Sequence, residues 1–111
     1  MPDIHPPLDI ARMRASARHV SALLRALANE DRLLLLCQMT QGERSVGEFQ
    51  AALDIRQPTL SQQLGVLRAE GLVTTRREGK RIHYSVADPK LLALLGSLYA
   101  LYCAPQEGEP G

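Results

Sequence analysis

Aromatic residues and cysteines are scarce in this chain. Its 111 residues include no Trp, one Phe, three Tyr and two Cys. So few aromatic rings argue against a surface on which single-stranded bases would stack. Two cysteines are too few for a disulfide scaffold or an all-cysteine zinc site, and the length suits a single domain.

Long apolar segments and a secretory leader are also missing. The uncharged stretch at residues 91–104 holds 14 residues, fewer than the roughly 20 that span a bilayer. The first ten residues carry Asp3, His5, Asp9 and three prolines rather than a basic start and an apolar core. We therefore expect a cytoplasmic protein that does not bind membranes and whose thiols are normally reduced.

A strong excess of positive charge is absent as well, since 13 basic residues face 12 acidic ones and the net charge is +1. This balance excludes a uniformly cationic nucleic-acid binder. The charge is nevertheless uneven, because residues 56–81 hold six basic residues against two acidic ones. Such a basic patch is typical of phosphate binding. A solvated surface explains the charge equally well, so the pattern of structural elements has to decide between the two.

The spacing of apolar residues predicts three helices in the first half of the chain. Asp9 caps a helix over residues 10–27 whose apolar side recurs every three or four positions. Asn29 caps a second helix that is apolar on nearly all sides and is therefore expected to be buried. A third helix follows the capping box formed by Ser45 and Glu48.

A three-residue turn at 54–56 joins the third helix to a fourth. Pro58 is expected at the first position of this fourth helix, where its missing N–H costs nothing. Gly71 ends the helix in the left-handed conformation that glycine favours. Three leucines form its inner stripe, namely Leu60, Leu64 and Leu67.

The period of the pattern then changes to two. This change predicts strands over residues 72–77 and 81–86, joined by a hairpin tip at 78–80. Asp88 and Pro89 start a last helix whose leucines and tyrosines cover more than one side. Such a helix needs a second surface to bury against, and a homodimer interface is the simplest supply.

Helix, short turn, helix and basic hairpin together predict a mainly α fold with a small β-hairpin wing, a homodimeric winged helix-turn-helix. We place this domain at residues 9–104, between a disordered segment 1–8 and a flexible tail 105–111. The fourth helix has about 13 residues and a length of ~20 Å, so it fits the major groove of double-stranded DNA. Short polar side chains near its start would read base edges, and the basic hairpin would hold phosphates. The expected DNA-binding residues are Arg56, Gln57, Thr59, Ser61, Gln62, Gln63, Arg68, Arg76, Arg77, Lys80 and Arg81.

Four segments resemble the ArsR/SmtB family of bacterial repressors over about residues 10–103. They are Leu27-Ala28-Asn29-Glu30-Asp31-Arg32-Leu33, Gln57-Pro58-Thr59-Leu60-Ser61-Gln62-Gln63-Leu64, Leu67-Arg68-Ala69-Glu70-Gly71-Leu72-Val73 and Arg77-Glu78-Gly79-Lys80-Arg81-Ile82-His83-Tyr84. The resemblance implies a homodimer paired through its first and last helices. It also implies a palindromic operator that is released when an inducer arrives.

Metal ligands of that family are missing at the positions where the resemblance would place them. The arsenic and cadmium sensors carry a Glu-Leu-Cys-Val-Cys-Asp-Leu pattern, and Ser45 and Gly47 stand where its cysteines would be. The zinc and nickel sensors use the last helix, but residues 90–102 hold no His, Asp or Glu. The three histidines lie on separate elements. We therefore expect no metal and no other cofactor.

The two cysteines stand at positions that resemble the persulfide-sensing branch of the family. Cys37 belongs to the second helix, and Cys103 ends the last one. The resemblance implies that reactive sulfur species link the two thiols of one subunit through a polysulfide bridge. We expect Cys103 to be attacked first and buried Cys37 to resolve the persulfide, with the reduced thiols near each other but too far apart for an unstrained disulfide.

Three other readings stay open. Cys37 could be a small core residue and Cys103 an incidental one, because free cysteines are often buried. A DNA-binding regulator could respond to general oxidants or another thiol-reactive ligand. The winged fold could also serve an interaction module that binds no DNA, since fold does not fix function. An enzyme is not expected, because neither an acid–base and nucleophile set nor a phosphate-binding glycine loop is present.

Overall fold

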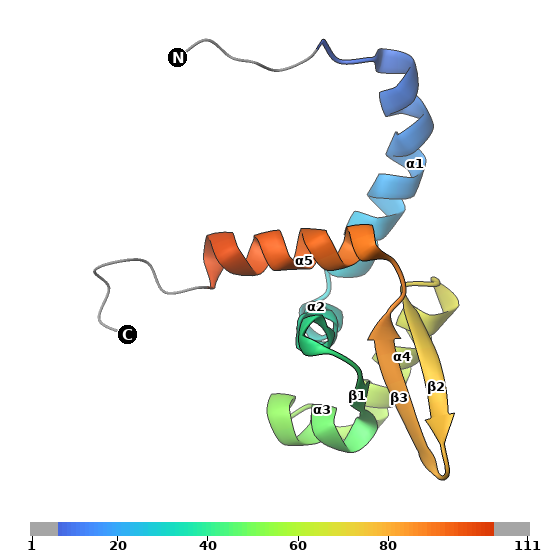
Figure 1. Ribbon diagram of the computed structural model, residues 1–111, viewed down its shortest axis with the longest axis vertical. Coiled ribbons are helices and arrows are strands. Elements are labelled where there is room, and N and C mark those ends of the chain that lie inside the picture. The colour runs from blue at the N-terminus through green and yellow to red at the C-terminus, as the bar shows by residue number, and fades with distance from the viewer. Residues whose placement is uncertain (1–6, 104–111) are drawn as a thin grey trace, which may run out of the picture.

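The computed structural model describes residues 7–103, which form five α-helices and a three-stranded sheet (Figure 1). The predicted disorder of residues 1–8 and the predicted flexible tail 105–111 fall outside this range, apart from Pro7 and Leu8. In the described part, no helix has both the length and the apolar character needed to cross a membrane. The elements in chain order are α1 (Ile10–Leu27), α2 (Glu30–Gln38), a 3-10 turn η1 (Met39–Gln41), β1 (Arg44–Ser45), α3 (Val46–Leu53), α4 (Gln57–Ala69), β2 (Val73–Glu78), β3 (Arg81–Val86) and α5 (Pro89–Tyr102).

Side-chain caps fix where four of these helices begin. Asp9, Asn29, Ser45 and Asp88 each accept a hydrogen bond from a backbone N–H two or three residues further on. The backbone N–H of Ser45 in turn donates to the Glu48 carboxylate, which completes the predicted capping box. Each cap satisfies a backbone donor that the helix leaves free and contributes about 1 kcal/mol. The predicted starts of α1, α2, α3 and α5 are therefore confirmed.

The helix-turn-helix consists of α3, the turn at residues 54–56 and α4. Asp54 ends α3 in the left-handed conformation with φ of 52°. Arg56 is the N-cap of α4 and Gln57 its first residue, so Pro58 stands at the second helical position. The prediction of Pro58 at the first position was wrong by one residue, because the first turn of a helix tolerates proline at more than one place. Gly71 has φ of +73° and ends the helix as predicted.

The wing is a sheet with strand order β1-β3-β2, all antiparallel. The β3 strand has its predicted bounds, whereas β2 begins at Val73 instead of residue 72 and extends to Glu78. Gly79 and Lys80 therefore form a two-residue tip, and Gly79 adopts φ of +61°. The short strand β1 was not predicted. It pairs with β3 directly before α3 begins, so it joins the wing to the helix-turn-helix.

The core lies where α2, α3, α4, α5 and the sheet meet. Phe49 of α3 is fully buried and packs its ring against Tyr84 of β3, with ring centroids 6.3 Å apart. The predicted inner stripe of α4 is buried as a whole. The α2 helix is not buried on all sides as expected, because Leu34 is 39% exposed and Cys37 is only half-buried. The buried aliphatic core residues outside α4 include Leu27, Leu35, Leu36, Met39, Val73, Leu91 and Leu95.

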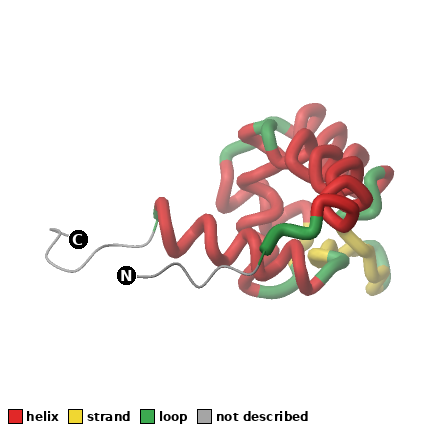
Figure 2. Tube along the Cα trace, turned by 90° about the horizontal axis from the view of Figure 1, so that it is seen from above, coloured by secondary structure: helices red, strands yellow, loops and turns green. Residues whose placement is uncertain are grey.

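Apolar side chains on α1 and α5 lie open to solvent in the single chain. The N-terminal part of α1 extends away from the rest of the molecule, and the C-terminal half of α5 extends away from it in another direction (Figures 1 and 2). Contact between so much apolar surface and water is unfavourable, so we expect a partner surface to cover it. The exposed residues of this kind include Ile10, Met13, Val20 and Leu24 on α1 and Leu92, Tyr99, Leu101 and Tyr102 on α5.

Candidate nucleic-acid interface and cysteine pair

The outer face of α4 carries the polar residues that the sequence assigned to base reading. Gln57, Ser61 and Gln62 are exposed at the start of the helix, while Thr59 is half-buried. The buried leucine stripe on the opposite side holds this face outward. Arg56 at the N-cap and Arg68 in the last turn are also exposed. These side chains are free to approach a groove or a phosphate.

Gln63 has a different environment from its predicted neighbours in the interface. Its Oε1 atom accepts a hydrogen bond of 2.9 Å from Nη1 of Arg32 in α2. Nε of the same guanidinium donates to the carbonyl of Ala26 at 2.8 Å. Arg32 therefore ties the end of α1 and the start of α2 to the middle of α4. In the single chain, Gln63 therefore helps to hold α4 against α1 and α2.

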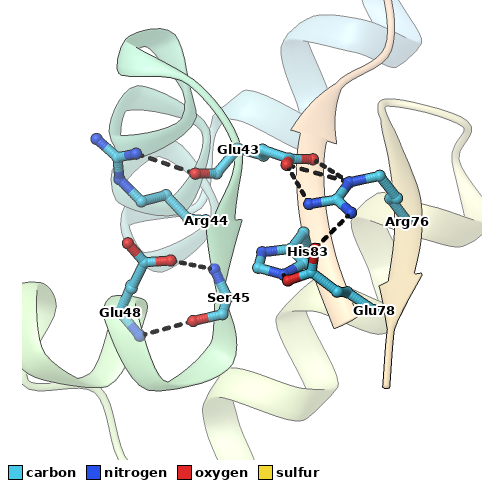
Figure 3. A network of polar contacts seen from close by, with 7 residues as sticks. All are labelled: Glu43, Arg44, Ser45, Glu48, Arg76, Glu78 and His83. Carbon is cyan, nitrogen blue, oxygen red and sulfur yellow. Dashed lines mark hydrogen bonds and ion pairs between the residues drawn. The ribbon is translucent and has the colours of Figure 1, made fainter. Parts of the chain in front are cut away.

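The four basic residues of the hairpin divide into two groups. Arg77, Lys80 and Arg81 are exposed around the tip of the wing. Arg76 is instead engaged with two carboxylates (Figure 3), since its guanidinium contacts Glu43 through Nε and Nη2 and Glu78 through Nη1. The predicted DNA contact of all four residues stays a prediction, but in the single chain Arg76 alone among them is engaged with carboxylates of the described residues.

Charge pairing shifts the acid–base equilibria beside the wing. The hydrogen bond from Arg76 lowers the pKa of Glu43, and the same pairing raises the pKa of Arg76. The backbone hydrogen bond from Ser45 lowers the pKa of Glu48 at the start of α3. Both carboxylates therefore stay ionised at neutral pH. His83 lies among these groups, with its buried Nε2 atom 3.6 Å from Glu78 Oε1 and without a hydrogen-bond partner among the described residues.

The structure brings the two cysteines to one cavity. Cys37 on α2 and Cys103 at the end of α5 both line a space of about 580 Å³. Both thiols are free, with Cys37 half-buried and Cys103 exposed. Among residues 7–103, no charged side chain lines this cavity, and the other lining residues are Leu33, Leu34, Gln38, Thr40, Gln41, Leu53 and Tyr99.

Burial raises the pKa of the Cys37 thiol, and the neighbouring Cys103 raises it further. A thiol that loses its proton reluctantly is a poor first nucleophile. The exposed Cys103 is the thiol that a reagent in solution meets first. The order of attack stays a prediction, and Cys37 is less buried than the sequence suggested.

Comparison with known proteins places this geometry in a family. The model for "Bacterial regulatory protein, arsR family" matches residues 29–75, which run from the cap of α2 into β2. The biofilm growth-associated repressor of Agrobacterium fabrum (strain C58 / ATCC 33970) is 53% identical over 109 residues, covering 94% of this chain and 93% of that protein. The chain belongs to the ArsR family.

Solved structures of ArsR-type proteins share the fold at substantial sequence identity. The transcriptional repressor BigR from Xylella fastidiosa superimposes with a TM-score of 0.81 at 44% identity, covering 88% of this chain and 100% of that one. A homodimeric winged helix-turn-helix domain from Mycobacterium bovis, described as a possible ArsR-family transcriptional regulator, gives 0.69 at 33% identity, covering 88% and 89%. The predicted winged helix-turn-helix fold and family are confirmed, and the ArsR family is one of regulators, not enzymes.

The positions that carry cysteines in metal-sensing members of the ArsR family have other uses here. Ser45 caps α3 through its hydroxyl oxygen, and Gly47 is exposed in the first turn. His19 is exposed on α1, and His83 lies in β3, the central strand of the wing. Within residues 7–103, no group of three or more His, Cys, Asp or Glu side chains is arranged to hold a metal ion.

Three residues that contact α4, the wing or the cysteine cavity were not singled out from the sequence. Arg32 orients α4, Glu43 binds Arg76, and Tyr99 lines the cavity of the cysteines. Arg32 stands inside the family-like segment 27–33, so its position gave a signal. Glu43 and Tyr99 gave none, because their partners come from distant parts of the chain.

Proposed function

We propose that this chain is a homodimeric transcriptional repressor that binds a palindromic operator and releases it when Cys37 and Cys103 become linked by a polysulfide bridge. The observation that carries the proposal is the shared cavity, to which α2 and the end of α5 each contribute one free thiol. The names of the similar proteins from Agrobacterium and Xylella, both called repressors, support the direction of regulation.

The sulfur chemistry balances without an external oxidant. The Cys103 thiolate attacks an inner sulfur of a hydrogen polysulfide, forms one S–S bond and displaces a terminal hydrosulfide. Cys37 loses its proton to solvent, attacks the sulfur next to the new terminal S–H and displaces a second hydrosulfide. Two thiols and one hydrogen polysulfide thus give a bridged protein and two hydrogen sulfide molecules. The polysulfide supplies the oxidising equivalents, since its S–S bonds are the ones reduced.

The size of the cavity that both thiols line supports extra sulfur atoms in the bridge. A simple disulfide needs Cα atoms within about 7 Å and little strain. A chain of three or four sulfur atoms spans a wider gap, and the cavity is large enough to hold it. We therefore predict that polysulfides act as inducers and that peroxide and glutathione disulfide act poorly.

Release of DNA follows from the place of α5 in the molecule. A bridge would tie the end of α5 to α2, and α5 carries part of the exposed apolar face that we assign to the dimer interface. A change at that interface alters the spacing of the two reading helices, which must match successive major grooves about 34 Å apart. The inducer weakens DNA binding because it favours a dimer geometry that DNA does not.

Intact-mass analysis tests the chemistry directly. Reduced protein is treated with a hydrogen polysulfide donor, and parallel samples receive glutathione disulfide, hydrogen peroxide or sulfide alone. We expect loss of two hydrogens and gain of one or more sulfur masses only with polysulfide, together with release of a palindromic duplex. A glutathione adduct or a plain disulfide as the main product would support a general oxidant sensor instead.

Single cysteine variants test the mechanism. Cys37→Ser and Cys103→Ser should each bind the operator as tightly as the parent protein and should not release it with polysulfide. A variant of either kind that still released DNA normally would contradict the bridge. If the reduced protein bound no duplex at any salt concentration, the winged fold would serve another kind of partner.

A further inference from the structure

A bidentate ion pair crosses the outer face of the wing. Arg76 donates from Nη2 to Glu43 Oε1 at 2.6 Å and from Nε to both carboxylate oxygens at 3.1 and 3.2 Å. Its Nη1 atom lies 3.4 Å from Glu78 Oε2. Figure 3 shows the Glu43 side chain reaching from the β1 side of the sheet over β3 to Arg76 on β2. One guanidinium is thus shared between two carboxylates on different parts of the chain.

The pair joins the two edges of a small sheet. Ser45, His83 and Arg76 are register partners in a row across β1, β3 and β2, and Glu43 stands just before β1. His83 lies beneath the pair, and its side chain is only 13% exposed. Because α3 starts directly after Ser45, the ion pair connects β2 to the short segment that leads into the helix-turn-helix.

Beyond the pairing of β2 with β3, the described residues give the outer part of the hairpin little apolar packing. Side chains at residues 76–81 are all exposed, and Val73 is the only fully buried residue of β2. A two-stranded ribbon with so little apolar packing is poorly ordered by itself. A bidentate arginine–carboxylate contact fixes orientation as well as distance, which a single-point ion pair does not.

We propose that Glu43 and Arg76 form a latch that sets the position of the wing relative to α4. Arg76 is then a positioning residue, and the phosphate contacts of the hairpin fall to Arg77, Lys80 and Arg81. A phosphate that approached Arg76 would meet two carboxylates already bound to its guanidinium. This assignment rests on the proposed binding of operator DNA, and it gives Arg76 a different role from the DNA contact expected from the sequence.

The sign of one substitution separates the latch from a phosphate contact. Glu43→Gln removes a negative charge near the wing. If Arg76 held a phosphate, the change would free Arg76, reduce repulsion and tighten DNA binding. If the pair is a latch, Glu43→Gln weakens binding by about two- to fivefold, the range expected for a well-formed exposed ion pair. Glu70→Gln controls for the loss of a negative charge, because Glu70 is exposed and has no ion pair within residues 7–103.

The salt dependence of DNA affinity gives the second measurement. Arg76→Gln should weaken binding to the same extent as Glu43→Gln and leave the slope of log affinity against log salt unchanged. Arg77→Gln, the matched control on the same strand, should flatten that slope by about one. The double variant Glu43→Gln/Arg76→Gln should be no weaker than either single variant, because all three lack the same contact.

Hydrogen exchange of the free protein tests the latch without DNA. Both single variants should exchange the backbone amides of residues 74–83 faster than the parent protein, with α4 unchanged. Failure of DNA binding in the parent protein would remove the proposed function and leave this result intact. Tighter DNA binding by Glu43→Gln, a flatter slope for Arg76→Gln or unchanged hairpin exchange would each overturn the latch.

Discussion

Arg32 in α2 donates a hydrogen bond of 2.9 Å to Gln63 in α4, the second helix of the helix-turn-helix. The same guanidinium also donates to the carbonyls of Ala26 and Arg25 at the end of α1. Arginine suits this place because its fixed fork of donors serves three acceptors at once. These contacts therefore hold α4 against α1 and α2, and α2 is also the helix that carries Cys37.

Loss of this contact should lower stability. We expect Arg32→Ala to reduce the free energy of unfolding by about 1–3 kcal/mol, since it removes the donor that serves the part-buried Ala26 carbonyl and the Gln63 side chain. Arg18→Ala, an exposed change on α1, should cost little. Urea unfolding of the reduced protein measures both. Equal stability of the two variants would show that the Arg32 contacts contribute nothing net.

Substitutions in α4 should distinguish a residue that contacts bases from one that holds the helix in place. Gln62→Ala should cost about 1–3 kcal/mol at the cognate operator and much less at random DNA, because an exposed Gln62 is free to contact a base edge. Gln63→Ala should weaken both duplexes to a similar degree, since Gln63 is bonded to Arg32. Titrations against operator variants with single base-pair changes measure this difference. A base preference lost only in Gln63→Ala would reverse the assignment.

The exposed apolar side of α1 should form part of a dimer interface. Leu24 is 53% exposed in the single chain, and Leu24→Glu should shift sedimentation from dimer toward monomer because it places a charge in an apolar contact. Ala15→Glu is the matched control, since Ala15 is an exposed residue outside the apolar stripe of the same helix. A parent protein that sediments as a folded monomer at micromolar concentration would contradict the proposed geometry.

The fold followed from local sequence signals, while much of the site did not. Caps such as Asp9 and Asn29 and the glycine at position 71 act over a few residues, so their effects are readable from the chain. The two-residue strand β1 has no periodicity of its own, and only its pairing with β3 defines it.

Residue roles in the site depend on contacts between segments far apart in the chain. Arg76 is a basic residue on the hairpin, as expected of a phosphate contact. Its guanidinium is nevertheless paired with Glu43, which lies 33 residues earlier in the chain. Cys37 and Cys103 were paired only through the family resemblance, because nothing in their spacing shows that α5 returns past α2. The structure supplies the shared cavity independently.

Alkylation of Cys37 in the reduced protein should require a higher pH than alkylation of cysteine in an unfolded peptide. Alkylation needs the thiolate, so its rate rises as pH passes through the pKa of each thiol. Burial and the nearby Cys103 raise the pKa of Cys37, so the alkylation of Cys37 should reach half its maximum at a higher pH than that of a free cysteine. In Cys103→Ser the effect of burial remains and the repulsion from a second thiolate is gone. The midpoint of Cys37 should therefore move down in that variant and still lie above the free-cysteine value.

Iodoacetamide labelling followed by peptide mass analysis gives the rate of Cys37 alkylation across pH 7–11 in the parent protein and in Cys103→Ser. A Cys37 midpoint at or below that of free cysteine would show that the cavity stabilises the thiolate, and Cys37 would then be the first nucleophile in place of Cys103.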